Sequence, residues 1–208
     1  HVKIFSGSSG GELRSFNALD PQFAGGVRVA AGDIDGDGRD DIITGGGVNG
    51  HVKVFSGSDG SAVRDFFAFG QNYNGGVHVG AADLNGDGVD DIITGSAAGV
   101  RGHVKVFDGI TMAELSSFHP FGDGFTGGVH VAGGSVIVSA GSGMDSLIQI
   151  YDALDGASPR SISPFGGFRG GVYVAASADV PEPQTWLLSG FALLCLWRKR
   201  SALRDSVS

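Results

Sequence analysis

Two short acidic segments are the residues of this chain best suited to chemistry. Residues 33–41 read Asp-Ile-Asp-Gly-Asp-Gly-Arg-Asp-Asp, and residues 83–91 read Asp-Leu-Asn-Gly-Asp-Gly-Val-Asp-Asp. Each segment places oxygen-bearing side chains at positions one, three, five and nine, and its glycines let the backbone turn sharply enough to aim them inward. A hard cation such as Ca²⁺ takes six to eight oxygen ligands at about 2.3–2.6 Å. The spacing therefore predicts one calcium site in each segment.

The expected ligands combine side-chain oxygens with one backbone carbonyl at position seven and water. They are Asp33, Asp35, Asp37, the carbonyl of Arg39, Asp41, Asp83, Asn85, Asp87, the carbonyl of Val89, and Asp91. Asp40 and Asp90 are expected to face solvent. Because the first segment supplies four carboxylates and the second supplies three with an amide, we expect the first to bind calcium more tightly.

Two other interpretations of the acidic segments exist. Asp-Gly and Asn-Gly pairs also form ordinary turns, but four carboxylates within nine residues would repel one another without a counter-ion. An EF-hand needs a glutamate at position twelve and flanking helices, whereas Thr44 and Thr94 hold that position and both flanks have strand patterns. A third unit connects its strands through Gly133-Gly134, so a short turn suffices where no metal is bound. We therefore interpret the acidic segments as hairpin calcium loops.

The elements that must position these loops repeat along the chain. His-Val-Lys-(Ile/Val)-Phe begins at residues 1, 51 and 103, with a weaker copy at 148–152, and Gly-Gly-Val-x-Val begins at 25, 75, 127 and 170. Apolar residues alternate at period two within each unit, which is typical of strands. The second unit predicts strands at 77–82, 91–94, 103–107 and 113–118. Four strands in about 40–50 residues match the size of a propeller blade.

We therefore expect an all-β fold, a partial β-propeller of about four blades, each a four-stranded antiparallel sheet, followed by a short C-terminal hydrophobic helix. Repeated large apolar residues are expected to pack between blades; they are Phe16, Phe66 and Phe118, and Leu19, Phe69, Phe121 and Phe165. The expected propeller domain covers 1–178, divided into a half blade at 1–24, blades at 25–74, 75–126 and 127–169, and the first strand of a next blade at 170–178.

The combination of a Phe-rich strand, a Gly-Gly turn, an acidic loop and an Asp-Ile-Ile-Thr-Gly strand resembles the FG-GAP repeat. This repeat builds the propeller of integrin α-subunits and of many bacterial surface proteins. The resemblance covers roughly residues 25–176 and the half-unit before them. It implies calcium as the cofactor of the acidic loops and a ring that is typically seven-bladed.

Residues 179–208 have a different composition. Pro181, Glu182 and Pro183 precede an uncharged run over 184–197 and a basic triplet at 198–200. This order resembles the PEP-CTERM sorting signal of Gram-negative bacteria. The resemblance implies recognition of the Pro-Glu-Pro motif by an exosortase, a transient inner-membrane anchor, and delivery to the cell surface or extracellular matrix. The uncharged run is shorter than the roughly 20 residues of a membrane-spanning helix, so a buried or interfacial helix is the alternative.

Charge and histidine placement restrict the remaining functions. The chain of 208 residues holds 14 Lys and Arg against 22 Asp and Glu, and its formal net charge of -8 argues against a nucleic-acid partner. His1, His51 and His103 are repeat-equivalent, and a second equivalent set consists of Arg28, His78, His130 and Tyr173. We interpret these histidines as structural, and the sequence shows no catalytic constellation.

We therefore expect a non-enzymatic, exported, calcium-binding propeller that serves adhesion or exopolysaccharide-matrix interaction, with a surface protein or a polysaccharide as its ligand. One alternative is the accessory propeller of a larger secreted polysaccharide-active enzyme whose catalytic domain lies upstream of residue 1. Another is a purely structural spacer. A catalytic domain upstream would favour the first alternative, and the absence of saturable ligand binding would favour the second.

Overall fold

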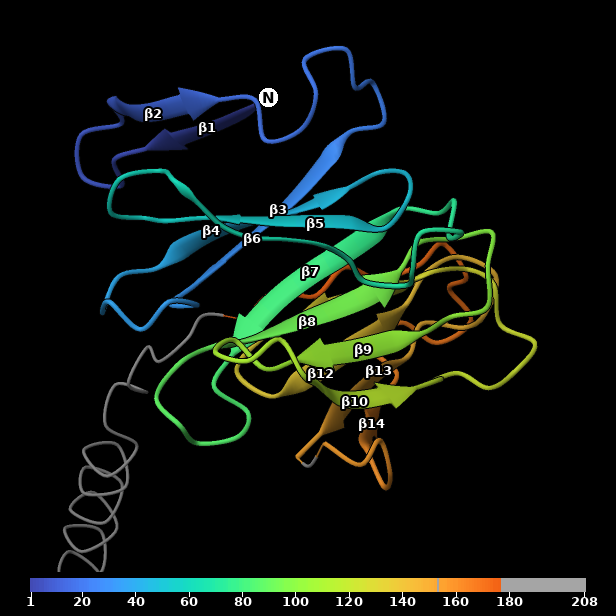
Figure 1. Cartoon of the computed structure of the whole chain (residues 1–208). Coiled ribbons are helices and arrows are strands. Elements are labelled where there is room, and N and C mark those ends of the chain that lie inside the picture. The colour runs from blue at the N-terminus through green and yellow to red at the C-terminus, as the bar shows by residue number, and fades with distance from the viewer. Residues whose placement is uncertain (153, 177–208) are drawn as a thin grey trace, which may run out of the picture. The chain divides into compact units, whose positions relative to one another are not determined.

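The computed structural model describes residues 1–152 and 154–176, and every regular element within them is a β-strand (Figure 1). β1 (Val2–Phe5) and β2 (Glu12–Phe16) form an antiparallel pair. Three four-stranded antiparallel sheets follow, each joined in simple up-and-down order. The first contains β3 (Val27–Gly32), β4 (Asp41–Gly46), β5 (His51–Phe55) and β6 (Ala62–Phe67); the second β7 (Val77–Ala82), β8 (Asp91–Ser96), β9 (Val104–Phe107) and β10 (Glu114–Phe118); the third β11 (Val129–Ala132), β12 (Val136–Ala140), β13 (Ile148–Tyr151) and β14 (Arg160–Ile162).

The expected all-β fold of four-stranded antiparallel sheets is confirmed. In the second unit the observed strands begin and end within two residues of the predicted ones. Residues 170–176 were expected to start a further blade. They are not assigned to a strand, although the Val172 N–H donates to the Ala140 carbonyl at 3.1 Å. The expected C-terminal helix and sorting tail lie outside the described residues. In the part of the chain that is described, no helix has the length and apolar character needed to cross a membrane.

Side-chain alternation along the strands produces two apolar cores, one on each face of the second sheet. Neighbouring residues of β8 show the rule, since Ile92 belongs to the core shared with the first sheet and Ile93 to the core shared with the third. Both side chains are fully buried. This two-sided burial explains why the Asp-Ile-Ile-Thr-Gly strands are almost entirely apolar or small.

Aromatic pairs join each sheet to the next at a repeated position. An aromatic residue of an outermost strand meets the third strand of the following sheet, with ring-centroid distances of 4.7–5.1 Å. The three pairs are Phe16 with Phe55, Phe66 with Phe107, and Phe118 with Tyr151. These contacts agree with the inter-blade packing that the sequence predicted for Phe16, Phe66 and Phe118.

The second strand of one sheet approaches the first strand of the next closely because glycine ends the Ile-Ile-Thr-Gly motif. A Cβ on Gly45 in β4 would lie 2.6 Å from the Val77 carbonyl oxygen, and one on Gly95 in β8 would lie 2.3 Å from the Val129 carbonyl oxygen. Real Cβ atoms do not come this close, so only glycine permits the contact. The acidic loops connect the first two strands of the first and second four-stranded sheets, so this close approach also brings each loop near the next sheet.

Candidate metal centre in the acidic loops

The first acidic loop connects β3 to β4 and winds around the carboxylate of Asp33. Asp33 Oδ1 accepts the N–H groups of Gly36 and Asp37 at 2.8 and 3.1 Å, and Oδ2 accepts that of Gly38 at 2.8 Å. Gly36 and Gly38 have φ of 76° and 81°, the left-handed region that glycine adopts without strain. The sequence spacing of glycine and aspartate thus produces a closed loop.

This winding brings three of the predicted ligands together. Asp33, Asp35 and Asp37 each present a carboxylate oxygen, and these oxygens all lie within 4.8 Å of one another. Two oxygens bound to one Ca²⁺ at about 2.4 Å can be separated by at most about 4.8 Å. The cluster therefore has the donor chemistry and the spacing of a calcium site. Asp35 and Asp37 are exposed and Asp33 is half-buried, so an ion can enter from solvent.

Asp41, the last residue of the first acidic segment, is buried and hydrogen-bonded to the backbone. Its side chain has no exposed surface, Oδ2 accepts the Ile34 N–H at 3.0 Å, and Oδ1 accepts the Gly57 N–H at 2.9 Å. Burial raises the pKa of Asp41, a shift that these hydrogen bonds oppose and that the neighbouring charges of Asp35 and Asp33 reinforce. Each carboxylate oxygen has two lone pairs, so these hydrogen bonds leave acceptor capacity on Asp41, and its ligation of calcium stays a prediction.

The second loop, between β7 and β8, is wound in the same way around Asp83. Asp83 Oδ1 accepts the N–H groups of Gly86 and Asp87, and Oδ2 accepts that of Gly88 at 3.0 Å. Asp91 repeats the role of Asp41, accepting the Leu84 N–H at 3.0 Å and the Gly109 N–H at 3.2 Å.

At position seven of the two loops, the N–H groups of Arg39 and Val89 donate to Asp37 and Asp87, both at 2.9 Å. Ligation by their carbonyls stays a prediction.

The loops differ at position three, where the second has Asn85. Its Nδ2 donates to Asp87 Oδ2 at 2.9 Å and to Asp108 Oδ2 at 3.0 Å. An amide N–H₂ group therefore links carboxylates in the second loop, whereas the first loop places only carboxylates together. Among the described residues, Asp33, Asp35 and Asp37 form the only group of three Asp, Glu, His or Cys side chains whose ligand atoms lie close enough together to hold one metal ion. Tighter calcium binding by the first loop stays a prediction.

Asp108 is a site residue that the sequence interpretation missed. It lies just after β9, and its equivalents in the other units are Ser6, Ser56 and Asp152. Aligning the repeats shows a polar residue at this position in every unit, which was the available signal. Asp108 Oδ1 also accepts from the Thr111 N–H and hydroxyl at 2.6 and 2.8 Å, so its carboxylate is held in place beside Asn85.

Asp90 corrects a second expectation. Asp40 is exposed as predicted, but Asp90 is half-buried and reaches across to the first loop. Its Oδ2 accepts the Asp33 N–H at 3.0 Å, and its own N–H donates to the Asp33 carbonyl at 2.8 Å. Burial raises the pKa of Asp90, while the hydrogen bond from Asp33 lowers it. Asp90, in the second loop, therefore joins the two loops.

Residues 33–94, which span both acidic loops, match the FG-GAP-like repeat, and residues 179–201 match the PEP-CTERM protein-sorting motif. The chain contains an FG-GAP-like repeat and a PEP-CTERM sorting motif. The family resemblances inferred from the sequence are thereby confirmed. A PEP-CTERM motif indicates a secreted protein of Gram-negative bacteria and implies processing by an exosortase.

Among solved structures, the chain is similar to the crystal structure of the exotype rhamnogalacturonan lyase YesX. The match has 19% sequence identity and a TM-score of 0.43, and it covers 64% of this chain and 32% of the lyase. The chain therefore spans about a third of that structure. No curated protein matches the chain.

Outside the FG-GAP-like loops, the repeat-equivalent histidines form cross-strand contacts. His1 Nε2 pairs with Ser15 Oγ at 3.0 Å, His51 Nε2 with Asp65 Oδ1 at 2.6 Å, and His103 Nε2 with Ser117 Oγ at 2.8 Å. The second set also meets across sheets, because His78 Nδ1 and His130 Nδ1 lie 3.2 Å apart. Burial, with Arg28 and His130 nearby, lowers the pKa of His78 to about 3. Both sets contact strand neighbours, which fits their interpretation as structural.

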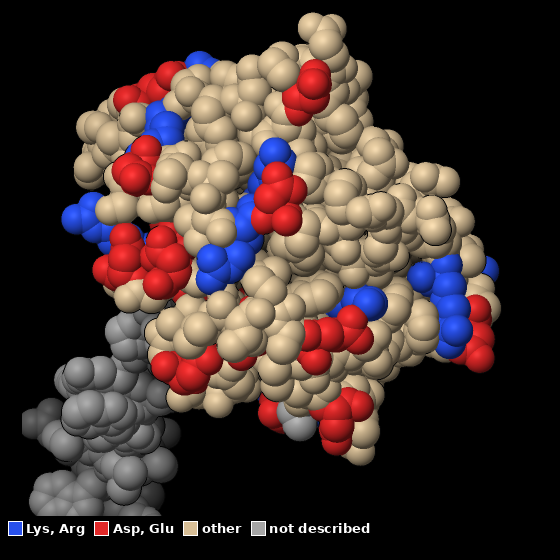
Figure 2. Space-filling view, viewed as in Figure 1, with Lys and Arg blue, Asp and Glu red and all other residues tan. Residues whose placement is uncertain are grey.

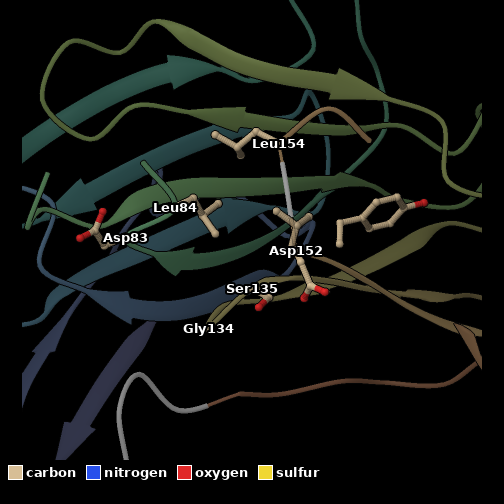
Figure 3. Close-up of a pocket in the computed structure, with 8 residues that line it drawn as sticks. Asp83, Leu84, Gly134, Ser135, Asp152 and Leu154 are labelled. Atoms are coloured by element: carbon tan, nitrogen blue, oxygen red, sulfur yellow. The ribbon is translucent and has the colours of Figure 1, made fainter. Parts of the chain in front are cut away.

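A small cavity of about 160 Å³ lies between the second FG-GAP-like loop and the third sheet (Figure 3). Asp83 and Leu84 line it from the loop, Ser135 from the β11–β12 turn, and Asp152 and Leu154 from beyond β13. Figure 3 shows Asp83 toward one end, apart from Asp152 and Ser135. Its carboxylates therefore do not converge as those of the first loop do. The turn at residues 133–135 is the short connection that the sequence predicted for a unit without an acidic loop.

Proposed function

We propose that this chain is a non-catalytic surface module whose sheets are blades of a calcium-binding β-propeller. It serves adhesion or interaction with an exopolysaccharide matrix after sorting through its C-terminal motif. The observation that carries the proposal is the convergence of Asp33, Asp35 and Asp37. Calcium supplies positive charge to these carboxylates when it binds. Asp33, Asp35 and Asp37 would hold it in the first loop, with Asp41 as a further predicted ligand.

Calcium at the first loop would act on more than one sheet. Asp33 is both a ligand candidate and the hydrogen-bond partner of Asp90, which lies in the acidic loop of the next sheet. An ion that fixes Asp33 would therefore also fix the junction between the two sheets. Extracellular calcium modules bind with dissociation constants of about 10⁻⁴–10⁻³ M. Such a site would be filled outside cells, where the sorting motif implies that the protein works.

The surface charge suits a partner other than nucleic acid. Figure 2 shows acidic side chains interspersed with Lys and Arg over the visible face. Several charged side chains of the described residues pair locally, as Lys3 with Glu12 and Lys105 with Glu114, both at 2.6 Å. Binding a nucleic-acid backbone requires a basic face, whereas binding a polysaccharide or a protein does not. This charge pattern supports the proposed partner class.

The test is thermal unfolding of the full chain in about 2 mM calcium and in excess chelator. With the dissociation constants above, calcium should add about 0.6–1.8 kcal/mol to the free energy of unfolding, a Tm increase of a few degrees. Asp37→Asn should remove most of this increase, because it takes one charge from the cluster. Asp40→Asn, three residues away and exposed, should retain it. Equal calcium responses in both variants would contradict the proposal.

A further inference from the structure

A cavity of about 420 Å³ opens between the chain segment after β2 and the first four-stranded sheet. Leu19, Asp20 and Phe23 line it from that segment, Val48 and Asn49 from the β4–β5 turn, and His51, Lys53 and Phe67 from β5 and β6. We name it the Phe67 cavity. Its volume falls in the range of small-molecule sites, about 300–1,000 Å³. It lies apart from the acidic loops, which connect the opposite ends of β3 and β4.

The cavity exists because one repeat has a smaller residue than its sisters. Leu19 occupies the position held by Phe69 and Phe121 in the next two units. In the second unit Phe69 packs on His103 and Tyr73, with ring-centroid distances of 5.4 and 4.9 Å. His103 is the equivalent of His51. In the second unit the ring of Phe69 therefore covers the histidine whose equivalent, His51, lines the cavity in the first unit. Leucine lacks that ring, and the space stays open.

The wall of the cavity presents an aromatic ring to solvent. Phe67 is 40% exposed, and its ring stacks on His51 at 4.7 Å with an interplanar angle of 20°. Asn17 and His119 hold the equivalent positions in the neighbouring units. The exposed phenyl ring is therefore particular to the unit that has the cavity. A large apolar side chain exposed beside a concave, partly polar surface is a feature of ligand sites.

Polar groups surround this ring. Lys53 Nζ pairs with Asp65 Oδ2 at 3.0 Å, so its charge is compensated at the cavity edge. Asp20 Oδ1 accepts the Gln22 N–H at 2.8 Å, which holds its carboxylate in place. Asn49 adopts a φ of 63° at the turn and lines the rim. Together these residues offer both donors and acceptors, and the one charge left uncompensated, that of Asp20, is negative and disfavours an anionic ligand.

We propose that the Phe67 cavity binds a neutral hexopyranose unit of a polysaccharide. One face of such a sugar carries C–H groups, which pack on an aromatic ring, and its edge carries hydroxyls, which are both donors and acceptors. Phe67 provides the ring, and Asp20, Asn49 and Lys53 provide hydroxyl partners. This proposal rests on the proposed function, for which it names the ligand class.

The experiment is isothermal titration calorimetry of the full chain, with calcium present, against malto-, cello- and manno-oligosaccharides. Oligogalacturonate serves as the acidic comparison. Leu19→Phe restores the residue of the sister units and fills the cavity, so binding should weaken about tenfold or more. Phe67→Asn, which copies Asn17, should weaken it similarly. The matched control Leu13→Phe makes the same change at a side chain that is 68% exposed on β2, and should leave binding unchanged.

The outcomes separate the cavity from the proposed function. Neutral-sugar binding that is lost in Leu19→Phe and Phe67→Asn, with wild-type melting temperatures, supports the cavity. Neutral-sugar binding that persists in both folded variants overturns the cavity and leaves the proposed function intact, as does binding of oligogalacturonate alone. If the wild-type chain binds no oligosaccharide, the cavity proposal and the polysaccharide part of the proposed function both fail.

Discussion

Asp90 and Asp33 join the two acidic loops through a reciprocal pair of backbone-centred hydrogen bonds. Asp90 Oδ2 accepts the Asp33 N–H at 3.0 Å, and the Asp90 N–H donates to the Asp33 carbonyl at 2.8 Å. The close fit is visible at Gly32, where an added Cβ would lie 2.6 Å from Asp90 Oδ2. A residue of the second acidic loop thus holds the first ligand candidate of the first acidic loop.

Removing the Asp90 carboxylate should destabilise the chain. Asp90→Ala leaves the Asp33 N–H without its side-chain acceptor in a half-buried position, which costs about 1–3 kcal/mol. The exposed Asp40→Ala should change the free energy of unfolding by less than about 0.5 kcal/mol. Urea unfolding of both variants measures this difference. Equal stabilities would show that the junction between the loops contributes nothing.

Adding a methyl group where the second strand of one sheet meets the first strand of the next should be destabilising. In Gly95→Ala the new Cβ would meet the Val129 carbonyl oxygen at 2.3 Å, and relieving such an overlap costs about 1–3 kcal/mol or more. Gly124→Ala is the matched control, because a Cβ there meets no atom within 4 Å. Thermal unfolding of the two variants should separate them by several degrees. A Gly95→Ala protein as stable as the control would contradict the close packing of β8 on β11.

Lys53 and Asp65 illustrate compensation between repeats. Lys3 and Lys105 pair with Glu12 and Glu114 on the adjacent strand, but Ala62 replaces that glutamate in the first four-stranded sheet. There Lys53 pairs with Asp65 instead. Asp65→Ser should cost about 0.2–1 kcal/mol, the range of exposed ion pairs.

Combining Asp65→Ser with Ala62→Glu reproduces the arrangement of the sister sheets. The double variant should recover the stability lost in Asp65→Ser, and this recovery should shrink in high salt because the pair is exposed. Chemical denaturation at low and high ionic strength makes the comparison. A double variant no more stable than Asp65→Ser would argue against exchange of the lysine partner.

Histidine burial should make the chain sensitive to mild acid. The pKa of His78 is about 3 in the folded chain, and burial, with His119 nearby, lowers that of His103 to about 4. Unfolded histidine has a pKa near 6.5, so between these values the unfolded state binds more protons. The free energy of unfolding therefore keeps its full value above pH 6.5. Below that pH it falls by at most about 1.4 kcal/mol per pH unit for each group.

His78→Gln should reduce this loss. The substitution removes one titrating group, so the free energy of unfolding should fall less steeply between pH 6.5 and about 4. Urea unfolding at several pH values, with calcium fixed, compares the slopes. A slope equal to that of the wild-type chain would show that His78 does not contribute.

The sequence predicted the repeat architecture well because the strands follow period-two alternation around fixed glycines. Positions such as Ile92 and Ile93 carry their opposite facings directly in the pattern. The side chains within the acidic loops were harder to assign, because contacts between units decide them. Asp90 has the sequence context of a solvent residue, yet the neighbouring loop buries it. Asp108 stands where two sister units have serine. Aligning the repeats shows that the position is polar, but its place beside Asn85 comes from the fold.

Calcium binding by the first loop is tested most directly by titration calorimetry of the full chain, comparing the wild type with Asp35→Asn/Asp37→Asn. We expect saturable calcium binding with a dissociation constant of about 10⁻⁴–10⁻³ M, and loss of the tighter component in the double variant. Binding heats that are identical in the two proteins would contradict the assignment of the cluster formed by Asp33, Asp35 and Asp37.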